Sequence, residues 1–407
     1  MQLTNSVNRR CMLCLVVGAL GLTRKRLFQW RSAKRVRPER KTPQIAQPYS
    51  LVFVTEIGVG NENFTVVVDT GSSDTWLVKT GFACSKGTTE AACDFGKTYD
   101  ESSTFQAIDN ENYDQSYSDG EYLFGGYGKD EVTVAGITVR DQQIAAVQSA
   151  NWNGDGVSSG VLGLGFPGNT KAYSGTSQLN DDTQIQYNPF FTSATTEGSV
   201  APLFSLAISR DTTGGMLAIG GLPAVAYVPV FASTPFQLLT ASSTSATAGA
   251  KPDYTFYTIT TNGFEYQSAQ TNWNVGSWLT YFGNPNDASE VQVIIDSGTT
   301  VNYLPQVTAD RVNALFEPAA TYDAQLGYYT VDCNAKAPEF GVRIGQEIFY
   351  INPLDNILKV TATGCITGIS RTGTGGHSTL GTVFLKNVLA VFDVGASQMR
   401  FAAREYS

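Results

Sequence analysis

The segment Val-Val-Val-Asp-Thr-Gly-Ser-Ser at residues 66–73 occurs a second time, as Ile-Ile-Asp-Ser-Gly-Thr-Thr at residues 294–300. Each copy is a β-branched run followed by aspartate, a hydroxyl residue, glycine and two more hydroxyl residues. A β-branched run of this kind predicts a buried strand, and the glycine permits a tight turn after it. Each copy therefore predicts a strand that ends in a carboxylate, Asp69 or Asp296, within a turn whose hydroxyl groups can donate hydrogen bonds to it.

A second pair of matching segments follows the two aspartates. Val161-Leu162-Gly163 comes 92 residues after Asp69, and Thr379-Leu380-Gly381 comes 83 residues after Asp296 (161 − 69 and 379 − 296). This internal repeat predicts two similar β lobes, residues 46–225 and 226–407, related by an approximate twofold axis. Lobes of this kind that face each other across a central cleft would bring the two carboxylates together.

Two carboxylates at close range share one proton over an acid range, because both cannot ionise easily. A water molecule held between them meets a base on one side and an acid on the other. Such a pair can add water to an amide carbonyl without a covalent intermediate, so the repeat predicts a peptide hydrolase. A glycosidase that uses two carboxylates is an alternative, but it does not explain the repeated hydroxyl and glycine positions.

Composition agrees with an all-β chain. Of the 407 residues, 42% are apolar and 15% are charged, which is below the usual level of about 25%. The apolar share allows a sizeable core, and the composition excludes disorder or a coiled coil for the whole chain. The body is expected to consist of short strands, with short helices near residues 309–316 and 381–388. Residues 203–222 are expected in a sheet that joins the lobes.

Charge divides the chain sharply. Residues 1–45 contain 11 lysines and arginines and one acid, which leaves 16 basic and 35 acidic groups in the rest, a formal net charge of −19 (27 − 11, 36 − 1 and 16 − 35). A body this acidic repels nucleic acid and anionic membrane surfaces at neutral pH. Below about pH 4 its carboxylates protonate, which permits work in acid.

The N-terminal residues 1–45 resemble a targeting segment. An Arg-Arg pair precedes the apolar run at residues 11–22, which is short for a membrane span and fits the core of a signal peptide. The basic stretch at residues 24–41 would then be a pro-segment or linker. We expect a secreted or vacuolar protein, and a signal-anchor is the alternative. The tripeptide Asn63-Phe64-Thr65 is a glycosylation sequon on a predicted hairpin.

Cysteine and histidine usage narrows the chemistry. His377 is the single histidine, which leaves little room for a zinc site or a Ser-His-Asp triad. Beyond residue 14 the cysteines form an even set in two sequence-local pairs, which suits two disulfides in an oxidising compartment. Four buried thiols are the alternative. We expect no metal ion and no cofactor.

At this point the sequence resembles the pepsin-like aspartic proteases, with a fungal character. The matching motifs are Asp-Thr-Gly-Ser-Ser-Asp-Thr-Trp at residues 69–76, Asp-Ser-Gly-Thr-Thr at 296–300, and Leu-Gly-Thr-Val-Phe-Leu at 380–385 followed by Val-Phe-Asp at 391–393. The resemblance extends from about residue 49 to residue 401. It implies a bilobal fold and an aspartic endopeptidase, monomeric by default, that hydrolyses extended protein or peptide substrates at acid pH.

The resemblance also implies roles for single positions. Asp69 and Asp296 would be the catalytic pair. The supporting groups would be the backbone amides and hydroxyls of Gly71, Gly298, Ser72 and Thr299.

Residues 117–120, Tyr-Ser-Asp-Gly, resemble the flap hairpin that closes over substrate and excludes water. The flap and substrate-binding residues would be Tyr117, Asp119, Gly120, Trp76, Val67 and Val161. The expected disulfides are Cys84–Cys93 and Cys333–Cys365.

Two positions depart from the family pattern. Ser297 stands where threonine is commoner, and no usual pro-segment is recognisable in residues 23–45. A non-catalytic binding or inhibitor protein on the same scaffold is a further alternative, although the intact Asp69, Asp296 and Tyr117 argue against it.

Overall fold

The computed structural model describes residues 27–32, 53–117, 120–176, 183–210, 215–239, 254–269, 286–361 and 363–404. Within these residues the regular structure is mostly β-strand, with three short α-helices and three 3-10 helices. The predicted all-β architecture is therefore confirmed.

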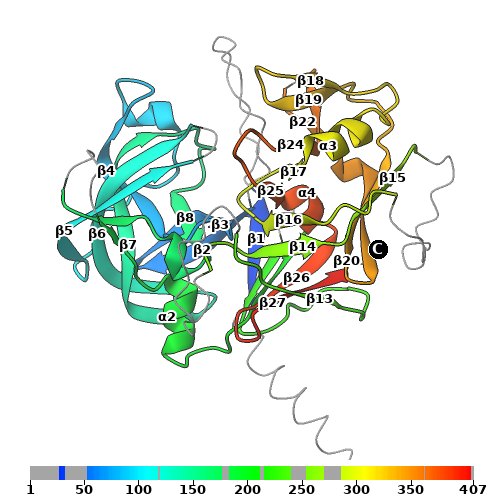
Figure 1. Ribbon diagram of the computed structural model, residues 1–407. Helices are drawn as coiled ribbons and strands as arrows, with labels where there is room; N and C mark the ends of the chain where they lie inside the picture. The colour runs from blue at the N-terminus through cyan, green and yellow to red at the C-terminus, as the bar shows by residue number, and fades with distance from the viewer. Residues whose placement is uncertain are drawn as a thin grey trace, which may run out of the picture.

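The first half of the chain contributes one set of strands to the left of Figure 1. These strands are β2 (Phe53–Val59), β3 (Glu62–Asp69), β4 (Trp76–Cys84), β5 (Gln106–Ser116), β6 (Tyr122–Val134), β7 (Ile137–Asn151), β8 (Gly160–Gly163), β9 (Ala172–Ser174) and β10 (Gln184–Ile185). The helices of this half are η1 (Glu90–Cys93), η2 (Pro167–Asn169) and α2 (Phe190–Thr196).

A second group of strands continues the same sheet across the middle of the molecule. It comprises β1 (Leu27–Ser32), β11 (Phe204–Ile208), β12 (Gly215–Ile219), β13 (Ala232–Pro235), β26 (Val388–Asp393) and β27 (Gln398–Ala403). The complete sheet has the order β10-β9-β5-β6-β7-β4-β8-β3-β2-β1-β12-β11-β26-β27-β13. Strands β11 and β12 lie within residues 203–222, so the predicted joining sheet is confirmed.

The second half of the chain lies to the right in Figure 1 and forms sheets of five, three and four strands. Its strands are β14 (Thr258–Thr261), β15 (Phe264–Gln267), β16 (Val291–Ile295), β17 (Asn302–Leu304), β18 (Thr321–Asp323), β19 (Tyr328–Val331), β20 (Glu339–Ile344), β21 (Glu347–Ile351), β22 (Ile357–Lys359), β23 (Cys365–Thr367), β24 (Ile369–Arg371) and β25 (Ser378–Leu380). Its helices are α3 (Gln306–Asn313), η3 (Pro353–Asp355) and α4 (Thr382–Leu385).

The sequence repeat is also a structural repeat. Strand β3 pairs in parallel with β8, and β16 pairs in parallel with β25. In the first pair, β3 leads to Asp69 and β8 carries the Val-Leu-Gly segment. In the second pair, β16 leads to Asp296 and β25 carries the first two residues of the Thr-Leu-Gly segment. The arrangement follows from the buried β-branched runs, since parallel strands are covered on both faces.

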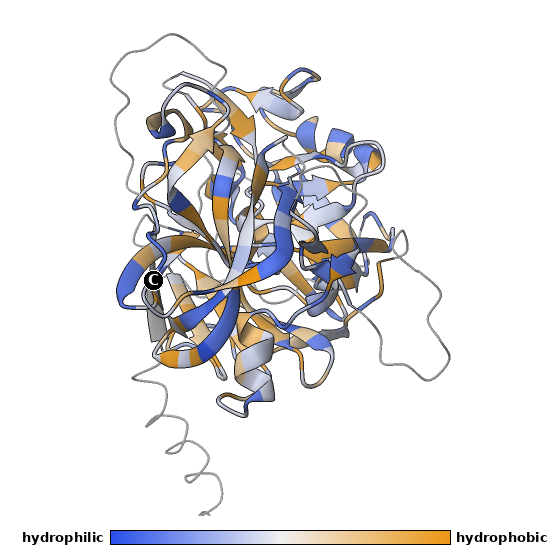
Figure 2. Cartoon of the chain, turned by 90° about the vertical axis from the view of Figure 1, so that its left-hand side faces the viewer, coloured by the Kyte–Doolittle hydropathy of each residue, from blue (hydrophilic) through white to orange (hydrophobic). Residues whose placement is uncertain are grey.

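Along other strands, buried and exposed residues alternate, so one face of the strand packs on the core and the other faces solvent. Along β6 buried residues alternate with less buried ones over most of the strand. Figure 2 shows the same alternation of hydrophilic and hydrophobic residues along strands of the first half. This period of two is the pattern of strands that bury one face.

The structure also contains elements that the sequence did not predict. Strand β1 pairs with β2 and β12, although the sequence suggested only a pro-segment or linker there. Helix α2 was not predicted either. The expected short helices are present with different bounds: α3 spans residues 306–313 instead of 309–316, and α4 spans residues 382–385 instead of 381–388.

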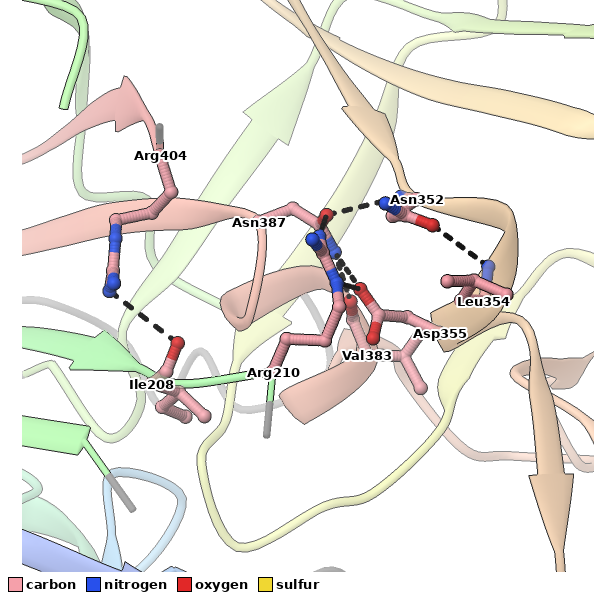
Figure 3. A network of polar contacts seen from close by, with 8 residues as sticks. All are labelled: Ile208, Arg210, Asn352, Leu354, Asp355, Val383, Asn387 and Arg404. Atoms are coloured by element: carbon pink, nitrogen blue, oxygen red, sulfur yellow. Dashed lines mark hydrogen bonds and ion pairs between the residues drawn. The ribbon is translucent and has the colours of Figure 1, made fainter. Parts of the chain in front are cut away.

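A buried polar network ties the joining sheet to the second half, as Figure 3 shows. Arg210, which follows β11, donates to Asp355 Oδ2 at 2.9 Å and to Asn387 Oδ1 at 2.8 Å. Asn387 in turn donates to Asp355 Oδ2 at 3.1 Å and to the carbonyl of Val383 at 2.9 Å. The Asp355 carboxylate is only 2% exposed, so its charge is held by these charge-assisted bonds rather than by water.

Both expected disulfides are formed, Cys84–Cys93 and Cys333–Cys365, so the alternative of four buried thiols is wrong. The sequon residue Asn63 is exposed on β3, and its glycosylation stays a prediction. Across the described ranges no helix is long and apolar enough to cross a membrane. The predicted signal peptide or signal-anchor at residues 11–22 lies outside the described residues.

Candidate active site

The two aspartates occupy matching places in the fold. Asp69 is the last residue of β3, and Asp296 directly follows β16. Asp69 is 7% exposed, while Asp296 is half-buried. Both strands are buried β-branched runs, so each carboxylate is delivered to the end of a rigid strand rather than to a mobile loop.

The same two groups hold each carboxylate. Gly71 N donates to Asp69 Oδ1 at 2.7 Å, and Ser72 Oγ donates to Asp69 Oδ2 at 2.5 Å. In the second copy Gly298 N donates to Asp296 Oδ1 at 2.8 Å, and Thr299 Oγ1 donates to Asp296 Oδ2 at 2.5 Å. The hydroxyl and glycine positions of the repeat thus orient the carboxylates, as the sequence suggested.

The second residue of each loop joins the two loops together. Thr70 N donates to Ser297 Oγ at 3.1 Å, and Ser297 N donates to Thr70 Oγ1 at 3.0 Å. Each hydroxyl then donates to the strand of the other half: Thr70 Oγ1 to the Ile295 carbonyl at 2.9 Å and Ser297 Oγ to the Val68 carbonyl at 2.8 Å. Four buried hydrogen bonds of twofold pattern therefore clamp the loops against each other.

The two carboxyl groups lie together, although 227 residues separate them (296 − 69). The negative charge of Asp296 acts directly on Asp69. The glycine of each loop also lies directly against the carboxylate of the other. A methyl group added to Gly71 would lie 2.5 Å from Asp296 Oδ1, and one added to Gly298 would lie 2.5 Å from Asp69 Oδ1.

Electrostatics at this point favour a shared proton. Burial raises the pKa of Asp69 above its usual range, and the negative charge of Asp296 raises it further. The bonds from Ser72 and Gly71 act in the opposite direction, but they are the smaller influence. The pair therefore holds one proton at a pH where an ordinary surface aspartate has lost it.

The glycines of the second repeated element explain why that element recurs. A methyl group on Gly163 would lie 2.4 Å from the Ser73 carbonyl carbon, and one on Gly381 would lie 2.5 Å from the Thr299 carbonyl oxygen. Only glycine lets these strands pack so closely against the two aspartate loops.

The expected flap is the hairpin between β5 and β6. Tyr117 N donates to the Glu121 carbonyl at 2.8 Å, and Gly120, at a φ of +89°, donates its N–H to the Tyr117 carbonyl at 3.1 Å. Trp76 Nε1 donates to the Tyr117 hydroxyl at 3.2 Å, so the predicted pairing of these two side chains is present. Asp119 lies outside the described residues.

The predicted pocket residues Val67 and Val161 lie opposite each other on β3 and β8. Both are buried in a cluster with Trp76, against which Tyr117 packs. They are 8% and 3% exposed, so they form the floor beneath the flap hairpin more than an open pocket wall.

Sequence reasoning missed three features. It did not foresee the reciprocal bonds between Thr70 and Ser297, although the hydroxyl after each aspartate was a visible signal. It also missed Trp152, whose ring contacts Tyr117 edge-on at 5.6 Å between centroids. The third is Asp74, a 1% exposed carboxylate within the first loop.

Comparisons with known proteins agree with this geometry. The family model for eukaryotic aspartyl proteases matches residues 52–404. A protein of Aspergillus fumigatus named "Probable aspartic-type endopeptidase" is 41% identical over 367 residues, which cover 86% of this chain and 78% of the relative. Penicillopepsin-1 of Talaromyces stipitatus is 27% identical over 355 residues, covering 86% and 78%.

The fold is similar to that of a solved aspartic proteinase from Irpex lacteus. The TM-score is 0.63, with 19% identity, and the match covers 87% of this chain and 95% of the other. This likeness concerns the two-lobed β fold.

Proposed function

Because the chain belongs to the eukaryotic aspartyl protease family and is an aspartic-type endopeptidase, we propose that Asp69 and Asp296 are its catalytic pair. The placement of the two carboxyl groups carries this proposal, because the glycine of each aspartate loop lies directly against the carboxylate of the other. The family acts on protein or peptide substrates, and we propose that an extended chain lies across the pair beside the β5–β6 hairpin.

In the proposed reaction a water molecule lies between the two carboxyl groups, which together hold one proton. The ionised group takes a proton from the water as its oxygen bonds to the amide carbonyl carbon, while the protonated group donates to the carbonyl oxygen. The resulting tetrahedral diol then loses its amine. One carboxyl group gives its proton to the nitrogen as the C–N bond breaks, and the other takes a proton from a diol hydroxyl, whose oxygen becomes the new carbonyl oxygen. A carboxylic acid and an amine leave, and the pair again holds one proton.

The supporting groups keep the pair ready for this transfer. Ser72 and Thr299 bond the Oδ2 atoms, and the amides of Gly71 and Gly298 bond the Oδ1 atoms. These donors fix the direction of each carboxylate, so no reorientation is needed as the proton moves. We assign the closing of the site over substrate to the hairpin that carries Tyr117.

The test is digestion of a denatured protein at pH 3–5 by the processed enzyme, with and without the inhibitor pepstatin. We expect cleavage that pepstatin blocks and that declines above about pH 6, as the shared proton is lost. Asp69→Asn and Asp296→Asn should each lower kcat at least about a thousandfold, because each removes half of the acid–base pair.

Asp287→Asn is a matched control. Asp287 is a 7% exposed aspartate of the second half that accepts from Thr308 Oγ1 at 2.9 Å, away from the catalytic pair. This control should keep native kcat. Native activity in either catalytic variant would refute the assignment of the pair.

We further propose that the enzyme passes through the secretory pathway and works outside the cell or in the vacuole. The two disulfides support this, since such bridges persist in oxidising compartments. We also propose a monomer, the division into lobes at residues 46–225 and 226–407, and a reaction that needs no metal or cofactor.

A further inference from the structure

We propose that Asp74 is a positioning residue for catalysis: its buried carboxyl group holds the base of the flap hairpin against the catalytic loop and so fixes Tyr117 beside the catalytic pair. This inference rests on the proposed function, in which the hairpin carrying Tyr117 closes over substrate. It concerns a side chain that takes no part in the proton transfer itself.

The contacts of Asp74 come from three separate parts of the first half. The Tyr127 hydroxyl on β6 donates to Asp74 Oδ1 at 2.7 Å, and the Tyr187 hydroxyl donates to the same oxygen at 2.8 Å. The backbone N–H of Lys171 lies 3.2 Å from Oδ1 and 3.1 Å from Oδ2. A single carboxyl group therefore joins one strand of the flap hairpin to two further segments.

On its other side Asp74 belongs to the catalytic loop. It follows Ser72 by two residues, and Ser72 bonds Asp69. It precedes Trp76 by two residues, and Trp76 bonds Tyr117. Any shift of Asp74 is therefore passed along two residues of backbone to Ser72 on one side and to Trp76 on the other.

A line of tyrosines continues from Asp74 to the flap. Tyr127 packs edge-on against Tyr113 at 5.7 Å between ring centroids, and Tyr113 lies on β5, the other strand of the hairpin. Tyr117 packs against the buried cluster that contains both Tyr113 and Tyr127. Asp74, Tyr127, Tyr113 and Tyr117 thus form a continuous packed path that starts at the catalytic loop and ends at the flap.

The surroundings of Asp74 show that this carboxyl group is held by hydroxyl donors. In the described part of the chain, no ion pair within 4.0 Å joins Asp74 to a lysine or arginine. Burial raises the pKa of Asp74, and the hydrogen bonds from Tyr127, Tyr187 and the Lys171 backbone oppose this more than the charge of Lys171 does. The titratable groups that face it are Tyr113, Tyr117, Tyr127, Tyr173, Tyr187 and Lys171. Burying a carboxyl group without a cation is costly, so fold stability alone offers no reason to retain Asp74 here. The alignment of the tyrosine hydroxyls offers such a reason.

The chain offers a matched control at Asp130, three residues after Tyr127 on β6. Asp130 is also 1% exposed, and it also accepts from a tyrosine, Tyr99 OH at 2.9 Å, and from Ser102 Oγ at 2.7 Å. Tyr99 belongs to the large central core, whereas Tyr127 belongs to the cluster beneath the flap. Asp130→Ala therefore tests the loss of a similar buried carboxylate on the same strand, whose tyrosine partner lies outside the cluster beneath the flap.

The experiment compares Asp74→Ala, Asp74→Asn and Asp130→Ala with the parent enzyme, first established as active and pepstatin-sensitive. The readouts are kcat and KM for a peptide long enough to span the cleft, the Kd of pepstatin, and Tm. We expect Asp74→Ala to lower kcat/KM about tenfold, the size of one charge-assisted hydrogen bond lost. The loss should appear mainly in KM and equally in the Kd of pepstatin, because the bonds to Asp69 remain.

Asp74→Asn should recover most of the loss, since its carbonyl oxygen still accepts from both tyrosine hydroxyls. Asp130→Ala should lower Tm but leave kcat/KM within about twofold of the parent. Native kinetics in a folded Asp74→Ala enzyme would overturn the proposal, and so would an equal kinetic loss in Asp130→Ala. Either result leaves the activity of the parent enzyme, and hence the proposed function, untouched.

If Asp74→Ala does not fold, the variants Tyr127→Phe and Tyr187→Phe test the proposal instead, because each removes only a hydroxyl group that donates to Asp74. A raised KM and a raised Kd of pepstatin in these variants support the proposal. Native values in both would overturn it.

Discussion

The substitution Thr70→Val tests the clamp between the two aspartate loops. Valine keeps the shape of threonine but removes the hydroxyl that donates to the Ile295 carbonyl and accepts from Ser297 N. Thr70 is 0% exposed, so water cannot replace either bond. Each lost bond that leaves a buried partner unsatisfied costs about 1–3 kcal/mol, so we expect a loss of about 2–4 kcal/mol in the free energy of unfolding after partial relaxation.

The assay is urea unfolding at a fixed pH between 4 and 5, together with kcat/KM for a peptide substrate. Thr75→Val is the control, because Thr75 is 1% exposed in the same loop and its hydroxyl has no hydrogen-bond partner among the described residues. We expect Thr75→Val to be neutral or stabilising. A Thr70→Val enzyme within about 0.5 kcal/mol of the parent, or an equal loss in both variants, would refute the reasoning.

Two further predictions concern the same site. Gly71→Ala should abolish activity, because the added methyl group would lie 2.5 Å from the Asp296 carboxylate and force the pair apart; a peptide-cleavage assay on the folded variant checks this, and native turnover would contradict it. Stability should fall as pH rises above about 4, the unfolded-state pKa of aspartate, because burial raises the folded-state pKa of Asp69 and Asp74 and the folded state therefore binds protons more tightly. Each group can contribute a slope of up to about 1.4 kcal/mol per pH unit over that window. Urea midpoints between pH 4 and 7 measure the slope, which should be smaller in Asp74→Asn; an unchanged slope in that variant would count against a raised pKa of Asp74.

Much of the catalytic loop could be predicted because its information is local. A β-branched run, an aspartate, a glycine and hydroxyl residues lie within eight positions, and each has a short-range physical role. The bonds of Ser72 to Asp69 and of Thr299 to Asp296 span only three residues. Repetition of the pattern added the long-range expectation that the two carboxylates meet.

Other features depended on contacts that no local pattern records. Strand β1 could not be foreseen, because Leu27–Ser32 lies in a basic segment and becomes a strand by pairing with β2 and β12. The role of Asp74 was hidden for a similar reason, since its partner Tyr127 lies 53 residues away and Tyr187 lies 113 residues away. Taken alone, an aspartate after two serines predicts only a turn.

The sequence by itself determined which groups each half brings to the cleft: one carboxylate, one amide and one hydroxyl, at the end of a buried strand. Only the tertiary structure decided how the halves are joined, through the exchange of hydrogen bonds between Thr70 and Ser297, and how Asp74 is linked to the flap. The physical reason is the sequence range over which the interactions act. Strand and turn preferences act over a few residues, whereas hydrogen bonds between residues 227 positions apart form only once both lobes have packed.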